Sequence, residues 1–189
     1  MKFRLDYLGY FHYYQPLMPP HRENTSLTTL KYIAHYPEHI QTQAAELLRS
    51  GQLGSYIQKN YPDSHPIQTD KALYQHINAL KNQYMRNIGP LTQVSYNSKL
   101  NVLKNALGIH TYQSRVQGNK LKAHNSITVA SLFKEAPPEF LQMIVVHELA
   151  HFKEKEHNKA FYQLCRHMEP EYHQFELDTR LWLHWRETV

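Results

Sequence analysis

A strongly apolar segment that contains two histidines and a glutamate constrains this chain more than any other feature. From Phe140 to about Lys155, apolar residues recur at the spacing of a buried helix. Its middle reads His147-Glu148-Leu149-Ala150-His151 and is flanked by Ile144-Val145-Val146 and Phe152. Burying two imidazoles and a carboxylate in an apolar wall is unfavourable unless something compensates them, and a cation would do so. The segment therefore predicts a core helix that carries a metal site.

The spacing H-E-x-x-H gives each of these polar residues a chemical role. Two histidines four residues apart on a helix point the same way, so His147 and His151 can both reach one metal ion. Glu148 projects beside them and can contact a water molecule held on that ion. We therefore expect a zinc site with Glu148 as the catalytic carboxylate.

A catalytic zinc site needs a third protein ligand and one open position. His157 is the first candidate, although a straight helix would carry it about 240° round from His151. Ligation by His157 therefore requires the helix to end and the chain to turn back, which Asn158 permits as the cap of a following helix. Two other candidates stay open, Glu154 on the same helix stripe as His147, and His173 further along.

Helical spacing dominates before Pro90, and strand-like alternation begins after it. We expect helices over 37–51, 53–59 and 70–89, strands over 91–96, 109–116 and 121–129, and helices over 140–155, 158–168 and 171–186. This order predicts an α+β fold with a helical N-terminal half and a small antiparallel sheet of about three strands packed on the histidine helix. We expect residues 1–90 to form a helical region and residues 91–189 the metal-binding domain, together in one compact unit.

Charge is distributed unevenly along the chain. The formal net charge is +5, yet residues 71–134 hold nine Lys and Arg and no Asp or Glu. Such a block can present a positive surface to a nucleic acid or another anion, or it can be a scatter of solvated side chains. The sequence leaves both interpretations open.

Composition excludes several classes of protein. One Cys cannot build a disulfide framework, and no apolar run approaches the roughly 20 residues of a membrane span. The first residues lack the apolar stretch of a signal peptide. We therefore expect a cytoplasmic protein that has no membrane partner, while its oligomeric state cannot be read from the sequence.

Residues 144–161 resemble the signature of the YgjP-like zinc metallopeptidases, relatives of the SprT and WSS-type proteases. In that family a third histidine follows H-E-x-x-H after five intervening residues. The resemblance extends over about residues 91–170 and implies a zincin-like fold, Zn²⁺ held by His147, His151 and His157, and Glu148 as catalytic acid and base. Members usually carry W-G-S-C on the strand before the hairpin, whereas residues 109–115 contain no Trp, Gly or Cys. This departure predicts a divergent subfamily.

The leading functional prediction is a zinc metallopeptidase that hydrolyses peptide bonds of a peptide or protein substrate. Zinc makes hydroxide available at neutral pH, and Glu148 takes the proton as the water attacks the carbonyl carbon. Tyr112, His110 and His124 are candidates for stabilising the oxyanion. We expect the substrate to pair as an extra strand along the edge of residues 121–129.

Two other functions remain open. A hydrolase of nucleotide phosphoanhydrides, such as a nucleoside triphosphate pyrophosphatase, would suit the acid-free segment 71–134. A non-catalytic zinc or nucleic-acid module is the third class. Structural zinc sites usually have four protein ligands and do not need a residue like Glu148, so the sequence favours an enzyme.

Overall fold

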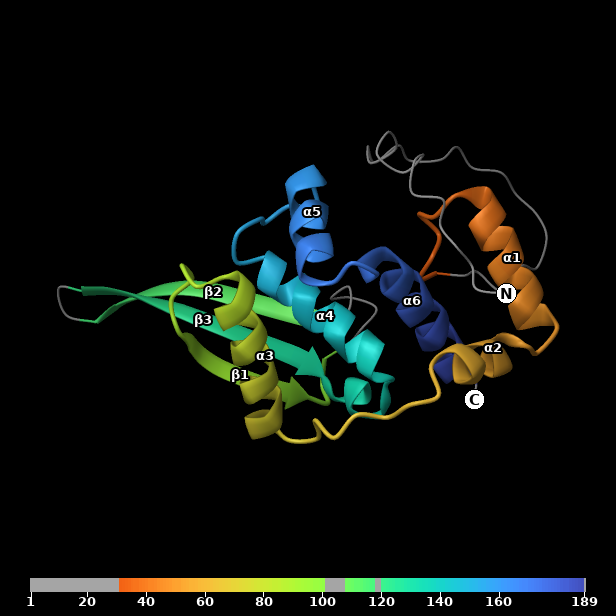
Figure 1. Cartoon of the computed structure of the whole chain (residues 1–189), viewed down its shortest axis with the longest axis horizontal. Coiled ribbons are helices and arrows are strands. Elements are labelled where there is room, and N and C mark those ends of the chain that lie inside the picture. The colour runs from red at the N-terminus through yellow and green to blue at the C-terminus, as the bar shows by residue number, and fades with distance from the viewer. Residues whose placement is uncertain (1–30, 101–107, 118–119, 189) are drawn as a thin grey trace. The chain divides into compact units, whose positions relative to one another are not determined.

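The structure, a computed structural model, describes residues 31–100, 108–117 and 120–188, with residues 108–117 and 120–124 described by their backbone alone. Figure 1 shows these elements, and the α+β class is confirmed. None of the described helices is long and apolar enough to cross a membrane. In chain order the elements are α1 (Glu38–Arg49), α2 (Leu53–Asn60), α3 (Asp70–Tyr84), β1 (Leu91–Asn97), β2 (Gly108–Gln117), β3 (Lys120–Ala130), the short 3-10 helix η2 (Ser131–Glu135), α4 (Pro138–Ala150), α5 (Lys159–Met168) and α6 (Tyr172–Thr188).

The three strands form one mixed sheet in the order β1-β3-β2. Strands β2 and β3 pair antiparallel, as the predicted hairpin requires. Strand β1 pairs parallel with β3, with Val94 opposite Ile127, so the prediction of an antiparallel sheet is wrong for this strand. Alternating hydrophobicity shows that a segment is extended and half-buried, but it does not show which way the segment runs or which strand lies beside it.

The position of β3 overturns part of a second expectation. Residues 125–129 pair with β1 on one side and with β2 on the other, so this part of the strand offers no edge to a substrate strand. Among the described strands, residues 121–124 pair with β2 alone. Only this first part of the expected edge could therefore take an added peptide strand, because backbone pairing needs unpaired N–H and C=O groups.

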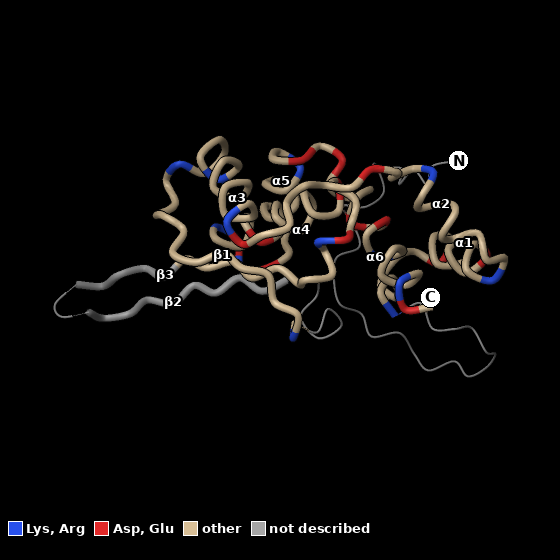
Figure 2. Tube along the Cα trace, turned by 90° about the horizontal axis from the view of Figure 1, so that it is seen from below, with Lys and Arg blue, Asp and Glu red and all other residues tan. Residues whose placement is uncertain are grey.

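Helices cover one face of this sheet. Figures 1 and 2 show α3 and α4 on the same side of the strands, with α3 against β1 and α4 against β2 and β3. Ile127 and Val129 of β3 and Leu73 and Ile77 of α3 are fully buried. The core that supports α4 therefore lies between the sheet and these two helices.

Two polar side chains fix the start of α3. Thr69 is the N-cap residue, and its hydroxyl accepts a hydrogen bond from the backbone N–H of Ala72 at 3.1 Å. Asp70, the first residue of the helix, accepts a hydrogen bond from the backbone N–H of Tyr96 at 2.8 Å. This bond joins α3 to β1.

The chain divides into two compact units, one made of residues 63–172 and the other of residues 31–62 and 173–188 among those described. The division therefore does not fall at residue 90, where composition changes. The helix α3 belongs with the sheet because it packs on β1 and is tied to it through Asp70. Composition reports local preference and carries no information about such long-range packing.

In the second of these units, a buried carboxylate joins α2 to α6. Asp178 is fully buried and accepts hydrogen bonds from the hydroxyls of Tyr56 (3.0 Å) and Tyr61 and from the side-chain amide of Gln174 (3.0 Å). Hydrogen bonds to a charged group are worth more than neutral ones, since the charge would otherwise lose its solvation without replacement. This network fastens α2 to α6.

We expect Tyr56→Phe to lower the free energy of unfolding by about 1.5–3 kcal/mol, because it removes one hydrogen bond to a buried carboxylate. Urea denaturation of both proteins measures the difference. The matched control is Tyr74→Phe, since Tyr74 is 37% exposed and water can replace its hydroxyl's partners. Its effect should stay within about 0.5 kcal/mol. Equal effects of the two substitutions would show that the Asp178 network contributes nothing specific.

Candidate metal centre

Helix α4 presents the polar residues of H-E-x-x-H from an apolar background. Pro138 opens the helix at a position where its missing N–H is not needed. Every residue from Phe140 to Ala150 except Gln142 is buried, including His147 at 5% exposure and Glu148 at 2%. The helix is therefore held on nearly all sides, which fixes the directions of these side chains.

The helix ends earlier than expected. It stops at Ala150, and the backbone N–H of Glu154 then bonds to the carbonyl of Ala150 at 3.0 Å in a tight turn. The expectation of a helix to Lys155 is wrong, because this turn replaces the last helical turn. Asn158 caps α5 as predicted, its side chain accepting from the N–H of Phe161 at 2.9 Å. The reversal between the two helices brings His157 back toward α4.

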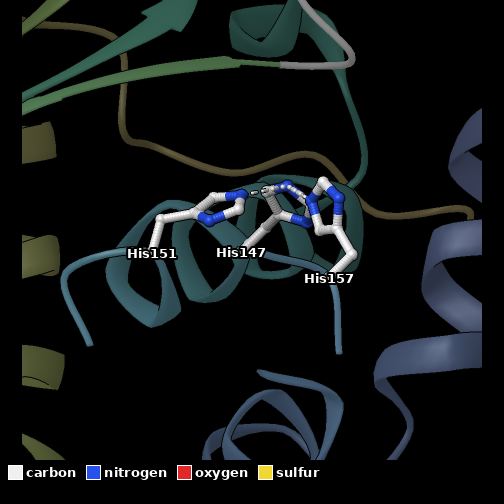
Figure 3. A group of neighbouring side chains, drawn as sticks. All are labelled: His147, His151 and His157. Carbon is white, nitrogen blue, oxygen red and sulfur yellow. Dashed lines mark hydrogen bonds between the residues drawn. The ribbon is translucent and has the colours of Figure 1, made fainter. Parts of the chain in front are cut away.

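The three histidines converge on one point. Nε2 of His147 lies 3.1 Å from Nε2 of His151 and 3.2 Å from Nε2 of His157, and Figure 3 shows the rings pointing toward one another. Two nitrogens bound to one tetrahedral zinc ion at about 2.0–2.1 Å are about 3.3 Å apart. Among the described residues, these three histidines form the one group of possible ligand side chains (His, Cys, Asp or Glu) that lie close enough together to hold a metal ion.

Hydrogen bonds on the far side of two rings fit the same role. Nδ1 of His147 lies 2.7 Å from the hydroxyl of Tyr172, and Nδ1 of His151 lies 3.0 Å from the backbone carbonyl of Glu154. A proton on each Nδ1 satisfies these acceptors and leaves both Nε2 atoms unprotonated, the form that binds a metal. The donor set therefore fits a divalent cation such as Zn²⁺.

A single aromatic ring lies against all three imidazoles. The ring centroid of Phe161 is 5.0 Å from that of His147, 4.6 Å from that of His151 and 4.8 Å from that of His157. Phe161 is itself fully buried. Its ring restricts the orientation of the histidines and excludes water from that side of the group.

The other candidate residues have different outcomes. Glu154 and His173 are not members of the three-nitrogen group. The backbone carbonyl oxygen of Glu154 lies against Nδ1 of His151, while its carboxylate lies 3.4 Å from the side-chain nitrogen of Asn158. The side chains of the proposed oxyanion residues, His110, Tyr112 and His124, lie outside the described residues.

Sequence reasoning missed Tyr172 and Phe161 as parts of the site. Tyr172 stands 25 residues after His147 and begins another helix, so no local spacing connects the two. Phe161 lies on the buried side of α5, but helical periodicity does not say which residues it meets. Local spacing therefore offers no signal for either contact.

Comparison with known proteins places this site in a family. The family described as YgjP-like, metallopeptidase domain, matches residues 18–184. The chain belongs to this family. The resemblance seen in residues 144–161 is thereby confirmed, and a metal-binding hydrolase is the class of enzyme that the family and the histidine group indicate.

The chain also resembles a curated relative with a more specific name. It is 58% identical over 157 residues to the UTP pyrophosphatase of Escherichia coli (strain K12), an alignment that covers 83% of this chain and 94% of that protein. No solved structure matches the chain significantly. The family description and the relative's name both denote hydrolases, although they name different bonds.

Proposed function

We propose that this protein is a zinc-dependent hydrolase of nucleoside triphosphates that releases pyrophosphate, with UTP as its first candidate substrate. The observation that carries the proposal is the 58% identity to a UTP pyrophosphatase over 94% of that protein's length. A cytoplasmic location, as predicted from the sequence, suits such a substrate. The residues of the histidine site supply the chemistry.

His147, His151 and His157 would hold the ion through Nε2, since these three atoms converge. When bound, Zn²⁺ would lower the pKa of a coordinated water toward about 7 and draw charge from a phosphoryl oxygen. In this proposal Glu148, which follows His147 in the chain and is 2% exposed, would accept the proton of the attacking water.

The proposed reaction balances without another reactant. The water oxygen forms a bond to the α-phosphorus, and the bond from that phosphorus to the oxygen bridging the α- and β-phosphates breaks. Glu148 takes one proton from the water and then delivers it to the departing pyrophosphate, which regenerates the carboxylate. The products are UMP and pyrophosphate.

The acid-free segment 71–134 supports an anionic substrate. Of its five described basic side chains, Lys71, Arg86 and Lys99 are exposed, Lys134 is half-buried and Lys81 is buried. All five belong to the compact unit that contains the histidine site. Figure 2 colours the Lys and Arg positions along the trace. Positive potential around a site raises the encounter rate of an anion such as a triphosphate.

Peptide-bond hydrolysis is the second candidate, because the family is described as a metallopeptidase domain. The same residues suit it, since Glu148 could take a proton from water and give it to the leaving amine. The two reactions differ in the charge of the substrate. A phosphoanhydride brings several negative charges to the site, whereas a peptide bond brings none.

The test uses zinc-loaded protein with UTP and, separately, with casein. We expect UTP to give UMP and pyrophosphate by phosphorus NMR, with activity lost on chelation and restored by Zn²⁺. In ¹⁸O-water the label should enter UMP, and the KM should rise with ionic strength because screening weakens attraction of the triphosphate. Casein cleavage without pyrophosphate release would instead support the peptidase. Neither activity in metal-loaded protein would contradict both proposals.

A further inference from the structure

Metal binding by histidine depends on which ring nitrogen carries the proton. Neutral imidazole has one N–H, and a ligand histidine binds through its other nitrogen. A hydrogen-bond acceptor opposite Nδ1 selects the form in which Nε2 is available and also fixes the ring's rotation. The acceptor therefore acts on the ion through the histidine.

The acceptor for His147 is the side chain of Tyr172. The hydroxyl oxygen lies 2.7 Å from Nδ1, and the two rings are close to parallel, with an interplanar angle of 16° and centroids 6.4 Å apart. Tyr172 is fully buried. Its position is thus set by packing, and the hydroxyl can accept the proton of Nδ1 with little freedom to move elsewhere.

The corresponding bond of His151 is of a different kind. Its Nδ1 meets the backbone carbonyl of Glu154, which every residue type would supply at that position. The bond of His147 depends on one hydroxyl group and so on one side-chain identity. Both acceptors are uncharged, so they make the two histidines less basic than carboxylate acceptors would. Less basic ligands neutralise less of the ion's positive charge, and more of it is left to attract an anionic substrate.

We propose that Tyr172 is a positioning residue that holds His147 in the metal-binding tautomer and orientation. This inference rests on the metal site of the proposed function and does not depend on which bond the enzyme hydrolyses. The hydroxyl accepts from Nδ1–H of His147, so Nε2 points without a proton toward Nε2 of His151 and of His157. Tyr172 would therefore act on the ion through His147.

The test is the zinc dissociation constant of Tyr172→Phe, measured by competition with a chromophoric chelator. The substitution keeps the buried ring and removes only the hydroxyl, so we expect zinc binding to weaken about 10–100-fold. The matched control is Tyr56→Phe, which also removes a buried tyrosine hydroxyl but one that bonds to Asp178 in the other compact unit. Its zinc affinity should remain within twofold of the wild-type value.

Affinities within twofold of wild type for both variants, or equal losses in both, would overturn the proposal.

A second measurement needs no variant at Tyr172 and so does not depend on how that variant folds. In the zinc-loaded wild type labelled with ¹⁵N-histidine, long-range NMR spectra should show His147 with a proton on Nδ1 and none on Nε2. A proton on Nε2 would equally refute the assignment. Neither measurement uses a substrate, so failure of UTP hydrolysis and failure of this inference are distinguishable.

Discussion

Glu148→Gln should reduce hydrolysis about 10²–10⁴-fold while the protein keeps its metal, since an amide of the same size cannot accept a proton from water. Metal is retained because the three converging nitrogens belong to His147, His151 and His157 and not to Glu148. The measurements are the rate of pyrophosphate release at saturating UTP and the zinc content of the purified variant.

The matched control for this substitution is Glu156→Gln. Glu156 lies in the same stretch of chain, but its side chain is exposed and it is not part of the three-nitrogen group. Its rate should equal that of the wild type. A Glu148→Gln protein that holds zinc and keeps full activity would exclude Glu148 as the proton acceptor, whichever bond is hydrolysed.

His157→Ala should weaken zinc binding by more than about 100-fold, because losing a ligand exceeds the effect of losing a hydrogen bond to a ligand. The substitution removes the nitrogen that lies 3.2 Å from Nε2 of His147. Since the side chain of His157 is exposed, the metal-free variant should keep its free energy of unfolding within about 0.5 kcal/mol. Chelator competition and urea denaturation measure the two quantities.

An exposed histidine in the same unit provides the comparison. His167 on α5 contacts the ring of Tyr84 and is not part of the metal group. His167→Ala should leave zinc affinity unchanged. Unaltered affinity in His157→Ala would mean that another residue completes the site, and the two alternatives raised by the sequence, Glu154 and His173, would have to be tested in its place.

The local parts of the site were readable from the sequence for a clear reason. Helical geometry repeats every 3.6 residues, so the relative directions of His147, Glu148 and His151 follow once the segment is a helix. The Asn158 cap is likewise a contact between residues three positions apart. The same local periodicity identified nearly all the helices and strands, although it placed the ends of α3 and α4 about five residues too late and left η2 out.

What the sequence determined by itself is thus the α+β class, the three strands, the H-E-x-x-H helix and the acid-free segment 71–134, since each depends on neighbouring residues or on composition. Only the tertiary structure decided the parallel pairing of β1, the return of His157 to α4 and the contact of Tyr172 with His147. Each of these joins residues whose separation in the chain carries no periodic signal. Their positions follow from the packing of whole elements around the buried core, which no local pattern encodes.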